Sequence, residues 1–427
     1  MGSTAASAAR TAGPAGTGRR RRVITGAGAA ALAAAALAAR RARRARRVTV
    51  YVVSGRIGVP GLVTPIRTAT NTAGPPIPVL LGQSIAITPD GKTAYVPSGR
   101  TGVPGVVTPI RTATNTAGPP IPVGSTPFGI VITPDGKTAY VVNTKDGTVT
   151  PIRTATNTAG PPVPVGNEPI RLAVTPDGTT VYVLNFDDAT VTPIRTASNT
   201  AGAPIPVGLQ PNAIAVTPDS QTVYVGNTGD TTLTPIRTAS NTAGPPIPVG
   251  RSPRAIAVTP NGKTAYVSNG DDDTVTPIRT ATNTAGAPIP VGAGPFDIAI
   301  TPNSKTAYVL NFNGDTVTPI RTATNTAGPP IPVGNEPFGI AITPNGKTAY
   351  VTGGTDSVTP IRTATNTAGK AISVGNLPWA IAITPNGKTV YVVNNGSGTV
   401  TPIGTATNTA GMAINVGTAP VSIAITP

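Results

Sequence analysis

The sequence repeats one stretch, P-N-G-K-T-A-Y-V at Pro344 to Val351, with small changes along most of its length. Every tyrosine of the protein belongs to a copy of this stretch. The nine tyrosines are Tyr51, Tyr95, Tyr140, Tyr182, Tyr224, Tyr266, Tyr308, Tyr350 and Tyr391. Successive tyrosines are 41 to 45 residues apart, and a period of about 40–50 residues is typical of solenoids, repeat arrays and propellers.

The composition excludes several kinds of site. The chain of 427 residues has no cysteine and no histidine, which excludes disulfides, thiolate and imidazole ligands, and a Ser-His-Asp triad. The net charge of +16 is concentrated near the N-terminus, because residues 1–47 contain eleven arginines and no acidic residue. Residues 48–427 therefore carry a net charge of only +5.

The N-terminal 47 residues have the composition of an export signal. Arg19 to Arg22 precede an apolar run of 17 residues at 23–39, which ends with the small-residue cleavage pattern Ala36-Leu37-Ala38. The R-R-x-Φ-Φ pattern at 20–24 is similar to a twin-arginine motif. We expect residues 1–47 to be an export signal, disordered or with one helix in the apolar run. The alternatives are a retained membrane anchor and an Arg/Ala-rich tail.

Four short segments in each unit of about 42 residues favour β-strands. Their patterns, I-A-I-T, T-A-Y-V, T-V-T-P-I and I-P-V, are rich in β-branched and aromatic residues. Between the first two segments, Pro134, Asp135 and Gly136 have the order expected for a tight hairpin. Four antiparallel strands per repeat describe a propeller blade. We therefore predict an all-β fold, with residues 48–427 forming a single β-propeller domain.

Prolines recur at two strand positions. In the fourth segment, Pro162 and Pro164 predict an outermost strand, because proline cannot donate to a ladder on both sides. Pro109, Pro151 and Pro193 fall inside the third segment, which should pair on both sides. There we expect a bulge or a late strand start.

The repeat region begins and ends with partial units. Val48 to Val52 form a second strand without a first, and Ile423 to Pro427 form a first strand without a second. Together they complete one blade. We predict about nine blades in a ring closed by a clasp between the C-terminal strand and the N-terminal strands. Seven or eight blades, with some copies displaced, are the alternative, because propellers usually have four to eight.

The motif Tyr-Val-x-Asn, at Tyr140 to Asn143 and at Tyr391 to Asn394, follows P-D-G-K or P-N-G-K and precedes T-V-x-x-I. With this pattern the chain resembles the YVTN-repeat β-propeller family over about nine-tenths of its length. The resemblance implies a prokaryotic protein that is exported or displayed at the cell surface, with lactonase-like hydrolases among its relatives. The chain departs from the usual pattern by its third-strand proline and by arginines such as Arg153.

The loops of each repeat fall into a constant and a variable set. The hairpin and the A-T-N-T-A-G segment barely change, whereas the segments after V-G and after Y-V-x-N change in almost every copy. Propeller geometry places the two sets on opposite faces, and function is expected on the variable loops. All five phenylalanines, the single tryptophan and twelve of the sixteen acidic residues lie in the variable loops. We expect net charges of −6 on this face and +11 on the other.

Seven residues of the variable loops are candidates for ligand binding. They are Phe128, Glu168, Arg254, Asp297, Glu336, Phe338 and Trp379. The aromatic ones share the position after the loop proline, where they form a binding platform or fill the gap between blades. Glu168 and Glu336 lie four units apart, too far for a close carboxylate pair. Asp271 to Asp273 lack the spacing of a Ca²⁺-binding loop and are interpreted as a solvated turn.

These observations predict an exported or cell-surface monomer that binds a protein, glycan or small ligand through its variable face. We expect no catalytic residue, metal or cofactor. The alternative is a lactonase-like hydrolase with a carboxylate or metal site at the channel mouth. Nucleic acid is disfavoured because the aromatic residues are not on the basic face, and membrane contact is expected only through residues 23–39, if they are not cleaved.

Overall fold

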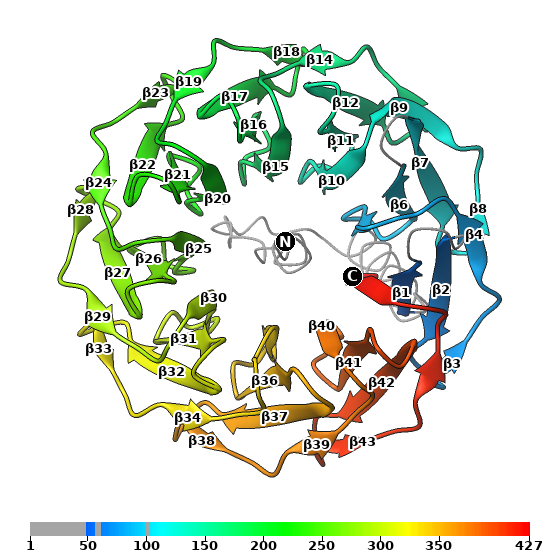
Figure 1. The fold of residues 1–427 in the computed structure, drawn as a ribbon. Coiled ribbons are helices and arrows are strands. Elements are labelled where there is room, and N and C mark those ends of the chain that lie inside the picture. Colours follow the sequence, from blue (N-terminus) through cyan, green and yellow to red (C-terminus); the bar gives the residue numbers. More distant parts are fainter. Residues whose placement is uncertain (1–47, 56–60, 100–102) are drawn as a thin grey trace, which may run out of the picture.

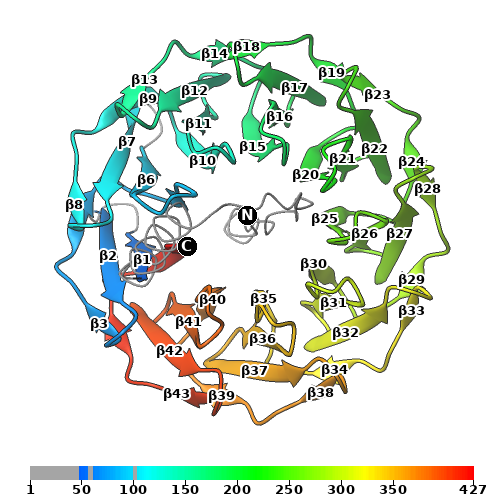
Figure 2. The same ribbon diagram turned by 180° about the vertical axis from the view of Figure 1, so that it is seen from behind.

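The computed structural model describes residues 48–55, 61–99 and 103–427. They form nine antiparallel sheets, arranged as blades in a closed ring (Figures 1 and 2). The described residues form strands and turns without a helix, and none of them belongs to a helix that could cross a membrane. The predicted all-β, nine-bladed propeller is confirmed. Residues 1–47, with the predicted signal and its helix at 23–39, lie outside the described residues.

We number the blades 1 to 9 in the order of their third strands. The innermost strands are β45 (Pro420–Ile425), β5 (Ala86–Ile87), β10 (Pro127–Ile132), β15 (Pro169–Val174), β20 (Pro211–Val216), β25 (Pro253–Val258), β30 (Pro295–Ile300), β35 (Ile340–Ile342) and β40 (Pro378–Ile383). The second strands are β1 (Thr49–Ser54), β6 (Thr93–Ser98), β11 (Thr138–Asn143), β16 (Thr180–Asn185), β21 (Thr222–Asn227), β26 (Thr264–Asn269), β31 (Thr306–Asn311), β36 (Thr348–Gly353) and β41 (Thr389–Asn394).

The third strands are β2 (Gly61–Arg67), β7 (Pro104–Arg111), β12 (Thr148–Arg153), β17 (Thr190–Arg195), β22 (Thr232–Arg237), β27 (Thr274–Arg279), β32 (Thr316–Arg321), β37 (Ser357–Arg362) and β42 (Thr399–Gly404). Each outer strand is split into two short pieces. The first pieces are β3 (Thr72–Ala73), β8 (Thr116–Ala117), β13 (Thr158–Ala159), β18 (Thr200–Ala201), β23 (Thr242–Ala243), β28 (Thr284–Ala285), β33 (Thr326–Ala327), β38 (Thr367–Ala368) and β43 (Thr409–Ala410). The second pieces are β4 (Ile77–Val79), β9 (Ile121–Ser125), β14 (Val163–Pro164), β19 (Ile205–Pro206), β24 (Ile247–Pro248), β29 (Ile289–Pro290), β34 (Ile331–Pro332), β39 (Ile372–Ser373) and β44 (Ile414–Asn415).

The split in the outer strand accommodates the third-strand proline. In blade 1, Pro65 lies opposite Tyr51 in an unbroken register, while β3 and β4 pair with β2 on either side of Pro65. The Pro65 carbonyl accepts the Gly74 N–H at 2.7 Å, so the missing proline N–H also faces outward, where the strand is interrupted. The expected bulge or late start in the third strand is therefore wrong. The outer strand breaks instead.

The predicted clasp closes the ring in blade 1. Strand β45 pairs antiparallel with β1, so that Ile423 lies opposite Val52. The Thr49 N–H donates to the Thr426 hydroxyl at 2.9 Å, and the Thr426 N–H donates to the Thr49 carbonyl at 3.0 Å. Blade 1 therefore combines one strand from the C-terminal end with three from the N-terminal end.

The apolar core lies between the blades rather than within them. Between blades 9 and 1, for example, Val50 and Ile66 pack against Val393 and Val400. Comparable clusters fill the other junctions of the ring. A blade buries its apolar side chains only against its neighbours, as expected for a repeat that cannot fold alone.

A buried tyrosine also links each blade to the next. Its hydroxyl donates to an asparagine side chain at 2.5 to 2.6 Å in the pairs Tyr51–Asn115, Tyr95–Asn157, Tyr140–Asn199, Tyr182–Asn241, Tyr224–Asn283, Tyr266–Asn325, Tyr308–Asn366, Tyr350–Asn408 and Tyr391–Asn71. Each asparagine has a φ of 50° to 55°, a left-handed conformation that asparagine tolerates better than most residues. The asparagine of the constant A-T-N-T turn thus accepts a hydrogen bond that recurs at every junction between blades.

The motifs V-G and Y-V-x-N meet at one close contact in most blades. In blade 4 the fully buried Asn185 donates to the Thr190 and Thr192 hydroxyls at 3.0 and 2.9 Å. A Cβ on Gly166 would lie 2.7 Å from the Asn185 Cγ and 2.6 Å from the Asp188 carboxylate. Only glycine fits at this position of the incoming loop.

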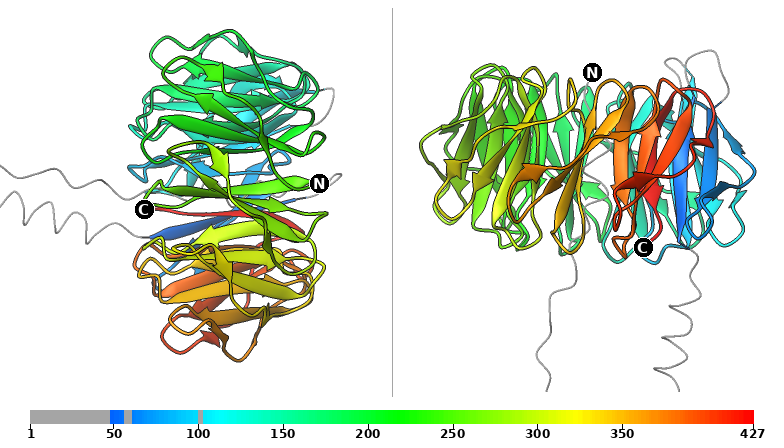
Figure 3. Two further views of the ribbon diagram at one scale, coloured as in Figure 1. Left: turned by 90° about the vertical axis from the view of Figure 1, so that its left-hand side faces the viewer. Right: turned by 90° about the horizontal axis from the view of Figure 1, so that it is seen from below.

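The ring has two different faces (Figure 3). The variable face carries the loops that lead into the innermost strands and the loops between second and third strands. The basic face carries the hairpins between first and second strands and the ends of the third strands. Its charged residues are Arg67, Arg111, Arg153, Arg195, Arg237, Arg279, Arg321, Arg362, Lys92, Lys137, Lys263, Lys305, Lys347, Lys388, Asp90, Asp135, Asp177 and Asp219. Their net charge is +10 rather than the expected +11, because Lys370 lies on the rim, between β38 and β39.

The tyrosine–asparagine hydrogen bond predicts a defined loss of stability. Tyr182→Phe should lower the free energy of unfolding by about 1–3 kcal/mol, because the partly buried Asn241 oxygen loses its donor. Asn241→Gly, which keeps the positive φ, should cost a similar amount, and Asn241→Ala about 1 kcal/mol more. Chemical denaturation measures these effects. A double variant, Tyr182→Phe with Asn241→Gly, that costs the full sum of the single changes would contradict the contact.

The tyrosines also predict alkaline unfolding. Burial raises the pKa of Tyr95, Tyr140, Tyr182, Tyr224, Tyr266, Tyr308, Tyr350 and Tyr391 to about 12. An unfolded tyrosine ionises at about pH 10. The stabilisation that the buried tyrosines give to the folded protein is therefore complete below that pH, and it is lost as the pH rises through about 12. Tyrosinate absorbance should therefore rise together with the loss of the β-sheet circular dichroism signal. Ionisation near pH 10 with an intact circular dichroism signal would refute this coupling.

Candidate functional site on the variable face

In six of the nine blades, a bulge in the innermost strand aims one side chain out of the sheet. In blade 7, Pro295 pairs with Asn311 and Asp297 with Leu310, so Phe296 is an extra residue without a ladder partner. Other blades have the same bulge after the loop proline, where the extra residues are Ile170, Asn212, Arg254, Trp379 and Val421. Bulges commonly re-aim side chains beside functional sites. Of the predicted aromatic candidates, Trp379 is placed by this bulge, whereas Phe338 precedes β35 and the register shift of blade 3 spans both Phe128 and Gly129.

Four aromatic rings meet on blades 7 to 9. The Phe312 and Phe296 ring centroids are 6.0 Å apart, those of Phe296 and Phe338 are 5.3 Å apart, and those of Phe338 and Trp379 are 4.2 Å apart and stacked. Trp379, at the end of this aromatic row, is 38% exposed. The contacts join three neighbouring blades, and the exposed end leaves an apolar surface that faces solvent.

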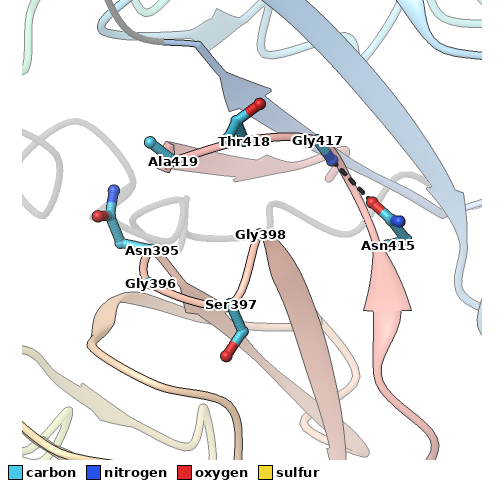
Figure 4. Close-up of a pocket in the computed structure, with 8 residues that line it drawn as sticks. All are labelled: Asn395, Gly396, Ser397, Gly398, Asn415, Gly417, Thr418 and Ala419. Atoms are coloured by element: carbon cyan, nitrogen blue, oxygen red, sulfur yellow. Dashed lines mark hydrogen bonds between the residues drawn. The ribbon is translucent and has the colours of Figure 1, made fainter.

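A polar hollow lies at the loops of blades 9 and 1 on the variable face (Figure 4). Its volume is about 540 Å³ and it lies between the loops of blades 9 and 1; its lining residues are Asn395, Gly396, Ser397, Gly398, Asn415, Gly417, Thr418 and Ala419. The Asn395 N–H donates to the Leu377 carbonyl at 2.8 Å, which ties this wall to the loop before Trp379. The lining contains no charged side chain, but offers amides, hydroxyls and backbone groups.

The residue before the loop proline has a left-handed backbone conformation. The φ values are 55° at Thr126, 47° at Glu168, 52° at Gln210, 53° at Ser252, 63° at Gly294, 48° at Glu336, 49° at Leu377 and 46° at Ala419. This conformation is costly for residues other than glycine. Hydrogen bonds hold it in place, as in blade 4, where the Glu168 carbonyl accepts the Phe186 N–H at 3.0 Å. The base of the variable loops is therefore fixed by the backbone.

Many acidic residues of the variable face stabilise these loops. The Asp146, Asp188 and Asp272 carboxylates each accept a backbone N–H of an incoming loop at 2.7 Å. Asp273 and Asp315 do the same at 2.8 Å. The Asn167 N–H and side chain hold the pKa of Asp188 below its ordinary value. The excess of acid on this face is thus largely structural.

Glu168 and Asp187 form a carboxyl pair that the sequence analysis missed. A hydrogen bond between the two side chains, together with burial and the Asp187 charge, raises the pKa of Glu168 above its ordinary value. Both residues are exposed and lie in blade 4. Two carboxyl groups joined by a hydrogen bond usually share a proton. The expectation that Glu168 and Glu336 do not pair is compatible with their positions in blades 4 and 8.

Asp297 is electrostatically coupled to Arg171, three blades away. Burial lowers the pKa of Arg171, and the negative charge of Asp297 raises it again. Both residues directly follow the bulge, in β15 and β30, where the other blades have glycine, alanine or serine. Their coupling runs across the inner side of the ring. Arg171 was detectable in the sequence as the one long side chain at a position that otherwise holds short ones.

The remaining predicted residues are dispersed. Phe128 is half-buried and packs against the core between blades 3 and 4. Arg254, in blade 6, lies 3.6 Å from the Asp271 carboxylate. Glu336, in blade 8, donates its backbone N–H to Asp315. The structure brings together only Phe338 and Trp379, and adds Phe296 and Phe312 to them. In the described part of the chain, no three acidic residues are grouped closely enough to hold a metal ion.

A comparison with family models finds one match, over part of the chain. The sequence model of the family described as "Lactonase, 7-bladed beta-propeller" matches residues 178–286, from the hairpin of blade 4 to the outer strand of blade 6. No curated protein is similar enough in sequence to count as a match.

Two solved structures share the fold. Dihydro-heme d1 dehydrogenase NirN in complex with DHE is 15% identical, with 77% of this chain and 74% of that chain covered and a TM-score of 0.60. AztD from Citrobacter koseri is 11% identical, with 89% and 97% covered and a TM-score of 0.58. At these identities the likeness concerns the fold alone.

The carboxyl pair predicts a measurable change in titration. Asp187→Asn should lower the pKa of Glu168, because the substitution removes the neighbouring negative charge. The chain contains only two glutamates, Glu168 and Glu336, so glutamate labelled with ¹³C at the carboxyl carbon gives two NMR signals. The Glu336 signal is the internal reference. If Asp187→Asn leaves the Glu168 titration unchanged, the two side chains do not share a proton.

Proposed function

We propose that this protein is an exported or cell-surface binding scaffold whose variable face binds a neutral saccharide. The observation that carries this proposal is the aromatic row of Phe296, Phe312, Phe338 and Trp379, together with the uncharged hollow whose wall is hydrogen-bonded to the loop before Trp379. Ligand sites combine apolar walls with a few placed polar groups, and a sugar offers apolar ring faces with hydroxyls at their edges. The row would stack on the ring faces, and the hollow would receive the hydroxyls.

Rigidity supports the same function. Phe296 and Trp379 emerge from bulges at the start of innermost strands, and hydrogen bonds fix the loops that carry Phe312 and Phe338. A binding surface that is ordered before the ligand arrives loses less conformational entropy on binding. Export rests on the sequence alone, through the signal-like residues 1–47 and the resemblance to YVTN-repeat propellers.

A lactonase-like hydrolase is the second candidate. It is favoured by the family match over residues 178–286 and by the raised pKa of Glu168 beside Asp187. A carboxyl group with a raised pKa suits general acid–base chemistry near neutral pH. Under this alternative the protein would hydrolyse lactones and lose that activity on Asp187→Asn. Under the scaffold proposal, lactones should not be hydrolysed faster than in buffer alone.

The saccharide proposal predicts that the aromatic row carries affinity. A panel of neutral oligosaccharides should change the fluorescence of Trp379, the only tryptophan. Trp379→Ala and Phe338→Ala should each weaken binding of the best ligand at least about tenfold by calorimetry, because aromatic anchors commonly contribute about 2 kcal/mol.

Phe128→Ala is the matched control, because Phe128 follows the loop proline of blade 3 but lies outside the aromatic row. It should leave the affinity within about twofold, which is below about 0.5 kcal/mol. Equal losses from Phe128→Ala and Trp379→Ala would contradict a site on blades 7 to 9. If Trp379 and Phe338 bind a protein and no saccharide gives a response, the ligand of this site is a protein and the saccharide proposal is wrong.

A further inference from the structure

We propose that the basic face docks the ring onto an anionic lipid surface through blades 6 to 9, so that the variable face points into solvent. This inference does not depend on the saccharide site, because it concerns the opposite face and other residues. It rests on the distribution of charge over one repeated hairpin and on the place where the chain joins the ring.

The hairpin lysine is neutralised in some blades and not in others. Lys92 and Lys137, in blades 2 and 3, lie 2.9 and 3.2 Å from Asp90 and Asp135 of the same hairpin. In blades 6 to 9 the residue two positions before the lysine is asparagine. Blades 4 and 5 have the aspartate but Thr179 and Gln221 in place of the lysine.

The aspartate and the asparagine support the hairpin in the same way. In blade 3 the Asp135 side chain accepts the Thr133 hydroxyl at 2.6 Å and the Lys137 N–H at 3.0 Å. In blade 6 the Asn261 side chain accepts the equivalent groups, at 2.7 and 3.1 Å. The exchange of acid for amide therefore leaves the turn intact and changes only its charge.

As a result, one sector of the basic face is strongly positive. On this face, blades 6 to 9 carry four lysines and three arginines without an acidic residue, a net charge of +7, whereas blades 2 to 5 carry only +2. All seven side chains are exposed. Clusters of four to eight basic residues are typical of surfaces that bind anionic lipids. We call this group, Lys263, Lys305, Lys347, Lys388, Arg279, Arg321 and Arg362, the lysine sector.

The chain joins the ring on the same face, next to the lysine sector. Thr49, at the start of β1, pairs with Arg67 at the basic end of β2, and blade 1 adjoins blade 9 through β45 and β1. The preceding sequence contains eleven arginines and the apolar run at 23–39. Stable membrane attachment generally needs two signals, such as an apolar segment together with a basic patch. The chain therefore enters the ring, at Thr49, on the face that carries the lysine sector.

A lipid surface fits this face better than a nucleic acid. The face is one flat side of a disc, as the edge-on views show (Figure 3). Its tyrosines are fully buried, and the phenylalanines and the tryptophan belong to the variable loops. Single-stranded nucleic acid would require stacking side chains among the basic ones. A bilayer requires only a flat array of exposed positive charges.

The test measures how the full-length protein sediments with phosphatidylglycerol-containing vesicles and with phosphatidylcholine vesicles. The variant N261D/N303D/N345D/N386D gives the lysine sector the acids that blades 2 to 5 already carry. Each charge near an anionic surface changes the affinity by roughly fivefold, so binding to the anionic vesicles should weaken by at least about a hundredfold. Phosphatidylcholine vesicles should bind no variant measurably.

The matched control changes the net charge equally on the opposite face. The variant N167D/N313D/N335D/N376D replaces four exposed asparagines of the variable loops and should alter vesicle binding by less than about threefold, because these loops are far from the lipid. Both variants keep residues 1–47, so the difference between them isolates the face. Equal weakening by both, or none by the first, would overturn the proposal.

The single tryptophan reports the orientation. Trp379 is exposed on the variable face, so brominated lipids should leave its fluorescence unquenched while the protein is bound to the vesicles. Quenching would place the variable face on the membrane and reject the proposal. Tighter binding to double-stranded DNA than to anionic vesicles at equal salt, with the same loss in N261D/N303D/N345D/N386D, would assign the lysine sector to nucleic acid instead.

Discussion

A tyrosine hydroxyl buried between every two blades is the contact on which the ring depends. It donates to an asparagine that is held in a left-handed conformation by the turn of the next blade. The last of these bonds joins Tyr391 to Asn71 and spans 320 residues of sequence. The aliphatic clusters around the tyrosines supply most of the buried apolar surface, but they are not directional. The hydrogen bond fixes how far each blade is rotated against its neighbour, and a repeated rotation of constant size is what closes a ring.

This contact accounts for the contrast between the two sets of loops. The asparagine of the A-T-N-T turn is the same in every copy because it presents the acceptor, whereas the threonine before it is serine in blades 4 and 5. The backbone of the variable loops is more restricted in conformation than their varied sequences imply. Several of their aspartates hold backbone N–H groups of incoming loops, and the residue before each loop proline has a positive φ. The side chains left for recognition include Phe296 and Trp379, which emerge from bulges.

Much of the architecture could be predicted from the sequence, because it depends on short repeated patterns. Nine tyrosines and two complementary half-units were enough to predict the number of blades and the clasp. The third-strand proline was misjudged, since the sequence does not show which neighbour of a strand will give way. The aromatic row could not be derived either. Phe296, Phe338 and Trp379 are about 42 residues apart, and their contact arises only when stacked blades bring the starts of their innermost strands side by side. Phe128 has the same sequence context but packs against the core in another part of the ring.

The clasp has a consequence for how the protein reaches its native state. Strand β45 completes blade 1, yet it follows the other eight blades in the sequence, so a growing chain exposes β1 without its partner throughout their synthesis. During that time Val50 and Val52 also lack the blade 9 surface against which they finally pack. An arc of stacked blades with an unpaired strand at its leading end is the kind of intermediate that associates with other chains. Ring closure therefore waits until β45 has been made, and it depends on very long-range contacts, which form slowly. Until β45 pairs with β1, the first strands to be made depend on other factors for protection against association with other chains.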